Sequence, residues 1–439
     1  MTGMHVLAID QGSSGAKAAV VDGEGRIVAM TSRRTPVEHP ETTAAQADPE
    51  MWWRALVSCV SRLPVHDVRA VAISGFMHTV VPVTDEGKVL GPALLWPDQR
   101  PDGPSAAERV AWWAERDPLA VLARWYLPVK DFLRMRLTGE AATDRYEAGG
   151  TGFLRDGAWS PAVATQAGIS ADRLPPIGEP LDVAGAVTRE AAAATGLPEG
   201  TPVVMGTGDW MATLLGSAAV LPRRACVYLG TAGAVGGFAS AESAAALTDP
   251  LCFAAATSTG SALDWIAELT GRGAPEAVAA AESVPPGARG VVVLPHLMGE
   301  RGMGHDRSAR GSVHGLTLAH GAADLARAVM EGTAFWLRAI AGAALDQRDP
   351  AELVAVGGGA RSDLWLRILA AVLKRDLTVP ETTEAGILGT AMIADRALSG
   401  RASHERWTRV ARTVPADPNL ANVYEPLFEE FLHLEERHR

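Results

Sequence analysis

Short apolar runs that end at glycine or at a polar residue recur along this chain, a pattern typical of buried strands. Residues 6–9 form the first run and end at Asp10. A second run, residues 18–21, follows the small segment 12–15 and precedes the turn signal at 22–25. The pattern predicts a β-hairpin with a glycine and serine tip and a carboxylate at its mouth.

Further strand patterns and a helical pattern continue the first half. Residues 26–32 predict a third strand, and Asp48 and Pro49 mark the start of a helix as N-cap and first helical residue. Its apolar positions at helical spacing are Trp52, Leu56, Val60 and Leu63. Residues 68–74 form another strand pattern that ends at Gly75, so the predicted order is three strands, a helix and a strand.

The middle of the chain contains helical patterns and one irregular segment. Residues 105–125 and 131–137 have helical patterns, whereas residues 141–176 are glycine-rich and irregular, as in loops that close over a ligand. Residues 203–205 predict a strand that leads into the glycine loop Gly206-Thr207-Gly208-Asp209.

A similar succession returns in the second half. Residues 225–238 predict two strands joined by the tip Gly230-Thr231-Ala232-Gly233, and residues 353–356 lead into Gly357-Gly358-Gly359-Ala360. The distance from the tip to the later glycines is longer than in the first half, which indicates an insertion. A repeat of this kind predicts two related α/β domains that face each other across a cleft.

Composition narrows the class of protein. The chain has 439 residues, enough for two domains, and its net charge of −11 argues against a nonspecific nucleic-acid binder. Three cysteines without CxxC spacing indicate neither a disulfide framework nor a zinc site. Residues 202–221 contain Asp209 and are unsuited to span a membrane, so we expect a cytoplasmic protein that acts on a small molecule.

The first hairpin tip suits a phosphate. Gly12, Ser13 and Ser14 offer backbone N–H groups and hydroxyls without bulky side chains, and Lys17 adds a positive charge. Asp10 suits Mg²⁺, which prefers oxygen ligands. The alternative is a plain hairpin in which Asp10 caps a turn. P-loop and Rossmann glycine motifs are absent from the sequence, which favours two hairpins that hold one polyphosphate.

Collinear motifs over nearly the whole chain resemble the FGGY family of carbohydrate kinases. They are IDQGSSGAKAAVVDGEG, ISGFMHTVVPVTDEG with ALLWPDQR, VKDFLRMRLTGEAATD, GTGDWMATLLG, YLGTAG, LPHLMGERGMGHDRSARGSVHGLTLAH, DLARAVMEGTAFWLR and VAVGGGARSDLW. Residues 129–144 and 294–338 are most similar to xylulokinases. The resemblance implies two actin-like (ribonuclease-H-like) ATPase domains, which we place at 1–222 and 223–439.

The resemblance also implies roles for matching residues. Asp209 matches the catalytic base that accepts the proton of the attacking sugar hydroxyl, and Asp10 matches the position that holds Mg-ATP through water. The resemblance also assigns sugar binding and the catalytic base to the N-terminal domain. The residues that match ATP-binding positions are Gly12, Ser13, Ser14 and Lys17 in the N-terminal domain, and Gly230, Thr231, Gly233, Gly357, Gly358, Gly359 and Ala360 in the C-terminal domain.

Sugar selection is expected from the N-terminal domain. Met77 and His78 match the family's substrate-contacting pair, and Trp96 and Asp98 lie in a neighbouring segment with Arg100, where Asp98 and Arg100 could instead brace a loop. Xylulokinases usually have asparagine after the base. This chain has Trp210, which would narrow the pocket and change its polarity.

The sequence therefore predicts an ATP-dependent kinase that phosphorylates a sugar hydroxyl, with a ketose such as xylulose as the first-choice substrate. Thr-Gly-Phe at 151–153 and the Met-His-Thr segment also resemble gluconokinases, so a gluconate or polyol kinase is the alternative. An actin-like ATP-binding module without kinase activity and a degenerate kinase that binds sugar without turnover are further alternatives. A homodimer is a possible assembly.

Overall fold

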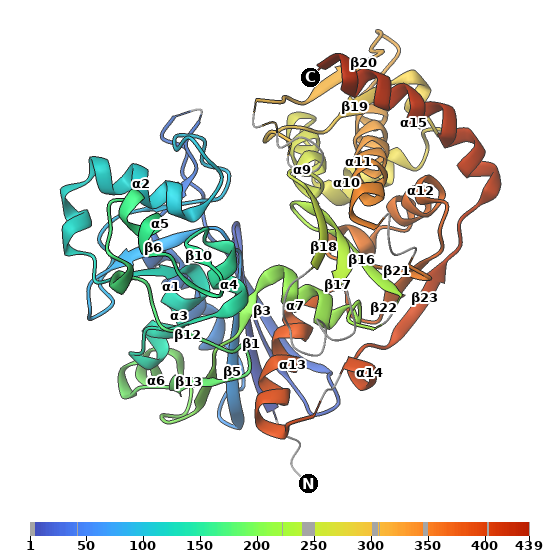
Figure 1. The fold of residues 1–439 in the computed structure, drawn as a ribbon. Helices are drawn as coiled ribbons and strands as arrows, with labels where there is room; N and C mark the ends of the chain where they lie inside the picture. Colours follow the sequence, from blue (N-terminus) through green and yellow to red (C-terminus); the bar gives the residue numbers. More distant parts are fainter. Residues whose placement is uncertain are drawn as a thin grey trace. The chain divides into compact units, whose positions relative to one another are not determined.

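A computed structural model describes residues 5–41, 43–221, 223–238, 251–300, 306, 308–345, 350–401 and 404–438 (Figure 1). Its contacts divide the chain into two compact units. Unit 1 comprises Met1–Gly216 and Ala385–Trp407, and unit 2 comprises Ser217–Glu384 and Thr408–Arg439. In the described part of the chain, no helix combines the length and the apolar character needed to cross a membrane.

Unit 1 is built on one mixed sheet. Its strands, in spatial order, are β13 (Val183–Ala186), β14 (Pro202–Val204), β5 (Val68–Gly75), β1 (His5–Gly12), β2 (Gly15–Val21) and β3 (Ile27–Arg34), and β15 (Thr207–Gly208) also pairs with β5. β1 pairs antiparallel with β2 and parallel with β5. The predicted hairpin and the predicted order of three strands, a helix and a strand are confirmed.

The described helices of unit 1 are α1 (Pro49–Val60), α2 (Ala106–Arg116), α3 (Val129–Thr138), α4 (Arg145–Gly150), α5 (Pro161–Gln166), α6 (Arg189–Thr195), α7 (Asp209–Gly216), α13 (Ala385–Ser399) and α14 (His404–Trp407). Of these, α1, α3, α7 and α13 pack against the sheet, whereas α2 and α5 pack against each other in a separate cluster. The helix α1 begins as predicted, because the Asp48 side chain accepts a hydrogen bond from the Glu50 N–H and Pro49 occupies the first turn. Its buried Trp52, Leu56 and Val60 join the core with β1, β5 and α3.

Two stretches of unit 1 differ from the patterns read in the sequence. The helical pattern over residues 105–125 ends at Arg116, because Pro118 begins a 3-10 turn (Pro118–Leu122) that leads into the strand β8 (Trp125–Pro128). β8 pairs with β6 (Val80–Val83). The segment 141–176, expected to be irregular, contains the short helices α4 and α5 and short strands such as β9 (Thr143–Asp144).

Unit 2 repeats the strand arrangement of unit 1. Its sheet has the order β18 (Leu251–Ala256), β17 (Gly233–Phe238), β16 (Arg224–Leu229), β21 (Glu352–Val356), β22 (Leu377–Pro380) and β23 (Val410–Val414). β16 pairs antiparallel with β17 and parallel with β21, as β1 pairs with β2 and β5. The helices of this unit include α9 (Gly260–Leu269), α10 (Ala274–Ala281), α11 (Ala322–Leu345), α12 (Asp363–Leu373) and α15 (Pro418–His438).

The division of the chain differs from our boundary at residues 222 and 223. The first change of unit falls after Gly216, and the segment Ala385–Trp407 returns to unit 1. In Figure 1 the orange helix α13 lies beside the green α7, and two glycines allow this contact. A Cβ atom on Gly216 would lie 1.9 Å from the Ala385 carbonyl oxygen, and one on Gly389 would lie 1.8 Å from that of Ala212. The two helix backbones therefore touch directly.

Candidate active site

Three neighbouring strands of unit 1 bring two predicted carboxylates to the same edge of the sheet. Asp10 on β1 lies in register with Ser74 on β5, and Ser74 lies in register with Thr207 on β15. Asp209 follows β15 directly. Since adjacent strands lie about 4.8 Å apart, Asp10 and Thr207 are separated by roughly 10 Å. The sequence predicted both residues, and the register places them near one another.

The Asp10 carboxylate is held by its neighbours on the sheet and on α13. The Ser74 hydroxyl donates to Asp10 Oδ1 at 2.8 Å, and Thr390 Oγ1 lies 2.7 Å from Ser74 Oγ. A Cβ on Gly386 would lie 3.0 Å from Asp10 Oδ2, so the glycine leaves room for the carboxylate. Lys17 is opposite Asp10 across the hairpin, on the same face of the sheet.

The tip of the first hairpin is a two-residue turn formed by Ser13 and Ser14. Gly12 and Gly15 pair directly across it, and the Thr35 N–H donates to the Ser14 carbonyl at 3.1 Å. Gly15 is required by the third strand, since a Cβ there would lie 2.6 Å from the Arg33 carbonyl oxygen. Ser14 is exposed and Ser13 is half-buried.

Asp209 is the first residue of α7 and the only residue of that helix that is not buried. The glycine loop before it is tight: Gly206 has φ of +77°, and a Cβ there would lie 2.0 Å from the Ile73 carbonyl oxygen. The Trp210 N–H donates to Asp209 Oδ1 at 2.7 Å and so fixes the carboxylate orientation. Trp210 itself is only 7% exposed, so most of its indole is buried.

The Met77–His78 pair is packed against α4 and the glycine loop. A Cβ on Gly150 would lie 2.5 Å from Met77 Cε, and one on Gly208 would lie 2.5 Å from Met77 Sδ. His78 adopts φ of +65°, and its Nδ1 donates to the Gly150 carbonyl at 2.7 Å. In a neutral ring Nε2 is then the hydrogen-bond acceptor.

The segment that contains Trp96, Asp98 and Arg100 is braced from within. Asp98 is fully buried, and its carboxylate accepts hydrogen bonds from the Ala45 N–H at 2.9 Å and from the Arg100 guanidinium at 2.6 to 3.1 Å. Arg100 also lies over the Trp112 ring at 4.8 Å. Asp98 and Arg100 therefore brace this loop, which was one of the two alternatives given by the sequence. A contact between Asp98 and a sugar stays a prediction.

A buried arginine that sequence reasoning missed ties these segments together. Arg109 on α2 is 2% exposed, and its guanidinium donates to four backbone carbonyls. The acceptors are Leu95 at 2.8 Å, Trp96 at 2.6 Å, Pro104 at 2.7 Å and His78 at 3.1 Å. The only sequence signal was an arginine next to the buried positions of an amphipathic helix. Arg109 therefore positions the backbone of two predicted substrate-contacting segments at once.

A cluster of charged side chains is buried below the glycine loop. The Lys130 ammonium lies 2.7 Å from Asp131 Oδ1 and 2.8 Å from Asp144 Oδ2, and Arg134 Nε lies 3.5 Å from Asp131 Oδ1. Burial opposes the charge of Lys130, but Asp131 and Asp144 outweigh that effect and raise the pKa of the ammonium group. Burial raises the pKa of the Asp144 carboxyl although Lys130 opposes the shift. In the sequence, residues 129–144 were recognisable only as a family motif.

In unit 2, the second hairpin tip is tied to the start of α9. The N–H groups of Thr259 and Ser261 both donate to the Thr231 carbonyl at 3.1 Å, and the Gly260 N–H donates to the Gly230 carbonyl at 2.8 Å. A Cβ on Gly233 would lie 2.3 Å from Thr259 Oγ1. Thr231 itself is exposed at the tip.

The glycines after β21 lie against this same hairpin. Gly357 has φ of +93°, and a Cβ there would lie 2.7 Å from the Leu229 carbonyl oxygen. A Cβ on Gly359 would lie 2.8 Å from Leu229 Cβ, whereas one on Gly358 would meet nothing within 4 Å. The structure thus brings Gly357 next to Gly230, and Gly358 faces open space. Ala360, the fourth residue of the motif, is buried.

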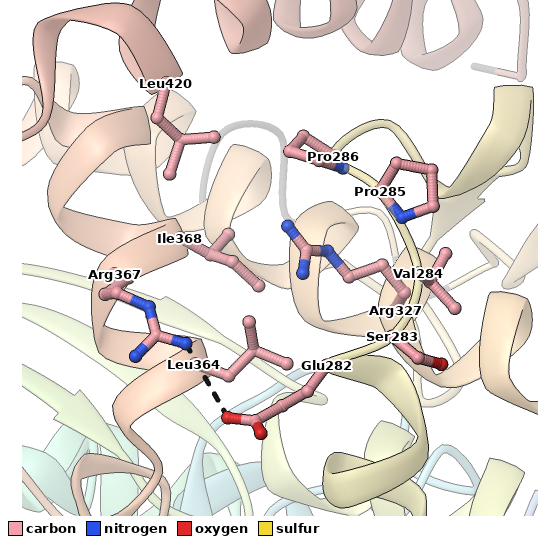
Figure 2. Close-up of a pocket in the computed structure, with 10 residues that line it drawn as sticks. All are labelled: Glu282, Ser283, Val284, Pro285, Pro286, Arg327, Leu364, Arg367, Ile368 and Leu420. Carbon is pink, nitrogen blue, oxygen red and sulfur yellow. Dashed lines mark ion pairs between the residues drawn. The ribbon is translucent and has the colours of Figure 1, made fainter.

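A separate cavity of about 340 Å³ lies in unit 2 among the end of α10, α11, α12 and α15 (Figure 2). Apolar side chains such as Leu364, Ile368 and Leu420 line it, and at its edge Arg367 lies 3.6 Å from Glu282. None of the predicted functional residues lines this cavity. In the part of the chain that the structure describes, no group of three histidine, cysteine or acidic side chains is arranged to hold a metal ion.

Comparison with known proteins agrees with this geometry. Residues 5–107 and 102–216 match the N-terminal domain of the FGGY family of carbohydrate kinases, and residues 203–398 match its C-terminal domain. The xylulose kinase of Escherichia coli is 32% identical over 88% of this chain and 89% of its own length. The gluconokinase of Bacillus subtilis is 25% identical over 89% of this chain and 86% of its own.

A solved structure shows the same fold. The ligand-bound xylulose kinase of Lactobacillus acidophilus superposes with a TM-score of 0.84, covers 99% of this chain and 98% of its own, and is 22% identical. The predicted two-domain α/β fold of the actin-like, ribonuclease-H-like type is therefore confirmed. The family resemblance and the expectation of a carbohydrate kinase are confirmed as well, which removes the non-catalytic ATP-binding module from the alternatives. The chain belongs to the FGGY family of carbohydrate kinases.

Proposed function

We propose that this kinase transfers the γ-phosphate of ATP to a hydroxyl group of a ketose such as xylulose, with Asp209 as the general base. The observation that carries the proposal is the placement of Asp209: a carboxylate at the start of α7 that is partly exposed while the rest of the helix is buried. The similarity to xylulose kinases at 32% identity supports the substrate class.

The proposed step needs few groups. Asp209 accepts the proton of the attacking hydroxyl as its oxygen bonds to the γ-phosphorus, and the bond between that phosphorus and the β–γ bridging oxygen breaks, which releases ADP. The hydrogen bond from the Trp210 N–H to one carboxylate oxygen orients the carboxylate at the start of α7. Positioning and charge neutralisation supply most of the catalysis in reactions of this type.

We assign nucleotide contacts to both units. In unit 1 the tip residues Gly12, Ser13 and Ser14, with Lys17, would contact phosphate. In unit 2 Gly230, Thr231 and Gly233 would contact phosphate, and the segment from Gly357 to Ala360 would contact adenosine. The open space at Gly358 supports the last assignment, because a ligand can approach the backbone there.

Asp10 is the residue that fits Mg²⁺. Its carboxylate is partly exposed, and Ser74 holds one of its oxygens. A single carboxylate that acts with water and phosphate oxygens is a common way for proteins to bind this ion. When bound, Mg²⁺ would neutralise phosphate charge.

The sugar would contact Met77, His78, Trp96 and Trp210, and Asp98 would shape the site by bracing its loop. The hydrogen bond from His78 Nδ1 to the Gly150 carbonyl fixes the ring orientation in this part of the proposed sugar site. Trp210 replaces the asparagine usual in xylulokinases, and its indole cannot offer the same amide contacts. Gluconate or a polyol is therefore the second candidate, and the similarity to a gluconokinase favours gluconate within that group.

The test is coupled ADP release from Mg-ATP with D-xylulose, D-ribulose, gluconate and glycerol, for the natural protein and for Asp209→Asn. We expect one strong substrate, and we expect Asp209→Asn to lower kcat by about 10³-fold or more while ATP binding, followed by calorimetry, persists. Asp156→Asn, at an exposed turn, is the matched control and should keep full turnover.

Each outcome has a separate meaning. Turnover by Asp209→Asn close to that of the natural protein would remove Asp209 from the base role. A strong response to gluconate or glycerol with none to xylulose would replace the ketose assignment. Background ADP release with every compound would favour the degenerate-kinase alternative.

A further inference from the structure

Five ionisable side chains form the buried cluster below the glycine loop: Lys130, Asp131, Arg134, Asp144 and Glu147. Each of them is at most 1% exposed. Two are cations, and the shortest contacts pair Lys130 with both aspartates. The neighbouring Arg145, at the start of α4, is exposed and pairs with the exposed Glu179 at 2.8 Å, outside the cluster.

Glu147 is the member of the cluster without a hydrogen-bonding partner. Neither of its carboxyl oxygens has one among the described residues, although both are buried. Asp144, in contrast, accepts hydrogen bonds from the Tyr146 and Glu147 N–H groups at 3.0 and 3.2 Å and so caps α4. A buried carboxylate without donors is costly, whereas a neutral carboxylic acid in the same place costs much less.

The charge balance of the cluster also favours a neutral Glu147. Lys130 and Arg134 are matched by Asp131 and Asp144, so an ionised Glu147 would leave the cluster with an excess negative charge. Burial raises the pKa of the Glu147 carboxyl well above its usual range. Lys130 lowers it in part, while Asp144, Asp131 and Asp209 raise it.

The cluster is also connected to the loop that presents Asp209. The Thr207 hydroxyl donates to Asp144 Oδ1 at 3.3 Å, and the Lys130 ammonium donates to the Met205 carbonyl at 3.4 Å. A Cβ on Gly208 would lie 3.2 Å from the ring of Tyr146, the residue before Glu147. Residues on both sides of Gly206 are therefore held by Lys130 and Asp144.

We propose that Glu147 is a positioning residue for Asp209 and that it acts as a neutral carboxylic acid. In this form it leaves the Lys130 ammonium to Asp144, which in turn holds Thr207 and the loop. If Glu147 loses its proton, it competes with Asp144 for Lys130 and adds a second negative charge near Asp209. Glu147 then sets the alkaline limit of turnover. The link to turnover rests on the proposed role of Asp209, whereas the neutral state of Glu147 does not.

The experiment compares the natural full-length protein with Glu147→Gln, which preserves a neutral side chain at every pH. We expect kcat near pH 7 to stay within about threefold, KM for ATP to be unchanged, and the alkaline fall of kcat to move up by at least about one pH unit. A loss of kcat of more than tenfold near pH 7, or an unmoved alkaline limb, would overturn the proposal.

Thermal melting from pH 6 to 9 gives a readout that does not depend on the reaction. A carboxyl whose folded pKa is raised binds its proton more tightly in the folded state, so it lowers stability progressively as pH rises from its ordinary pKa to its folded pKa. Glutamine lacks this effect. We therefore expect the Tm of Glu147→Gln to rise relative to that of the natural protein as pH increases. A Tm difference that stays constant from pH 6 to 9 would show that Glu147 is ionised and would overturn the proposal.

Two further variants distinguish a failure of the Asp209 assignment from a failure of the Glu147 proposal. Glu331→Gln changes a buried glutamate in unit 2 that is bonded to Arg327 and Tyr424, so it should lower Tm without moving the alkaline limb. If Asp209→Asn retains turnover, the proposed base fails while the melting result for Glu147 still stands. If Glu147→Gln does not fold, infrared spectroscopy of the natural protein at pH 7 decides the protonation state of Glu147. A protonated carboxylic acid gives a distinct band, and comparison with Glu331→Gln identifies any part of that band that comes from Glu331. The absence of a remaining band would overturn the proposal.

Discussion

At the scale of single residues, the site depends on where a side chain is missing as much as on where one is present. Gly357 and Gly359 are required by packing, since a Cβ at either would come within 2.8 Å of Leu229 atoms. Gly358 has open space around its Cβ position. Three adjacent glycines that look alike in the sequence therefore have different reasons to be glycine.

This difference predicts the effects of two substitutions. Gly358→Val should leave Tm nearly unchanged and raise KM for ATP about tenfold, equivalent to about 1.4 kcal/mol of binding, because its side chain occupies the proposed adenosine approach. Gly357→Val should lower stability by about 1–3 kcal/mol, since φ of +93° is strained for valine. Melting curves and ATP kinetics measure both effects. An unchanged KM for ATP in Gly358→Val would contradict the assignment.

At the scale of elements, the contact between α7 and α13 is made of backbone. Gly216 and Gly389 let the helices touch at their carbonyl groups, and Gly386 and Thr390 of α13 reach Asp10 and Ser74 on the sheet. A helix near the C-terminal end of the chain thus supports a carboxylate near its beginning. Small residues spaced along 385–399 were the available sequence signal, but such spacing does not identify the partner.

For one substitution in α13, helix propensity and packing predict changes of opposite sign in the free energy of unfolding. Replacing a glycine inside a helix by alanine normally stabilises by about 1 kcal/mol. Gly389→Ala should instead destabilise by about 1–3 kcal/mol, because its Cβ would lie 1.8 Å from the Ala212 carbonyl oxygen. Gly342→Ala in α11, where nothing lies within 4 Å, is the matched control and should stabilise. Urea unfolding measures both, and equal effects would contradict the close contact.

At the scale of the whole molecule, most of unit 2 is inserted between two segments of unit 1. The points where the chain leaves and re-enters unit 1 are adjacent, because a Cβ on Gly216 would lie 1.9 Å from the Ala385 carbonyl oxygen. A short linker can therefore replace the insertion without stretching the fold.

This arrangement predicts which fragment folds. Residues 1–216 joined to 385–407 by a few glycines and serines should give a soluble, cooperatively melting unit. Residues 1–222 alone should melt at lower temperature or aggregate, because they lack α13 on the sheet. Circular dichroism melts of both fragments provide the measurement. Equal stability of the two would show that α13 does not belong to the core of unit 1.

The sequence by itself determined most of the local elements, the repeat and the family. Hairpin tips, the N-cap at Asp48 and apolar spacing act over a few residues, and the collinear motifs identified the kinase family, including Asp10 and Asp209 as candidates. It could not determine which distant segments meet. The return of α13 to unit 1, the four carbonyls bound by Arg109 and the burial of Glu147 among charges depend on contacts between residues far apart in the chain. Only the tertiary structure decides such contacts, because charge and burial at one position depend on side chains supplied by other elements.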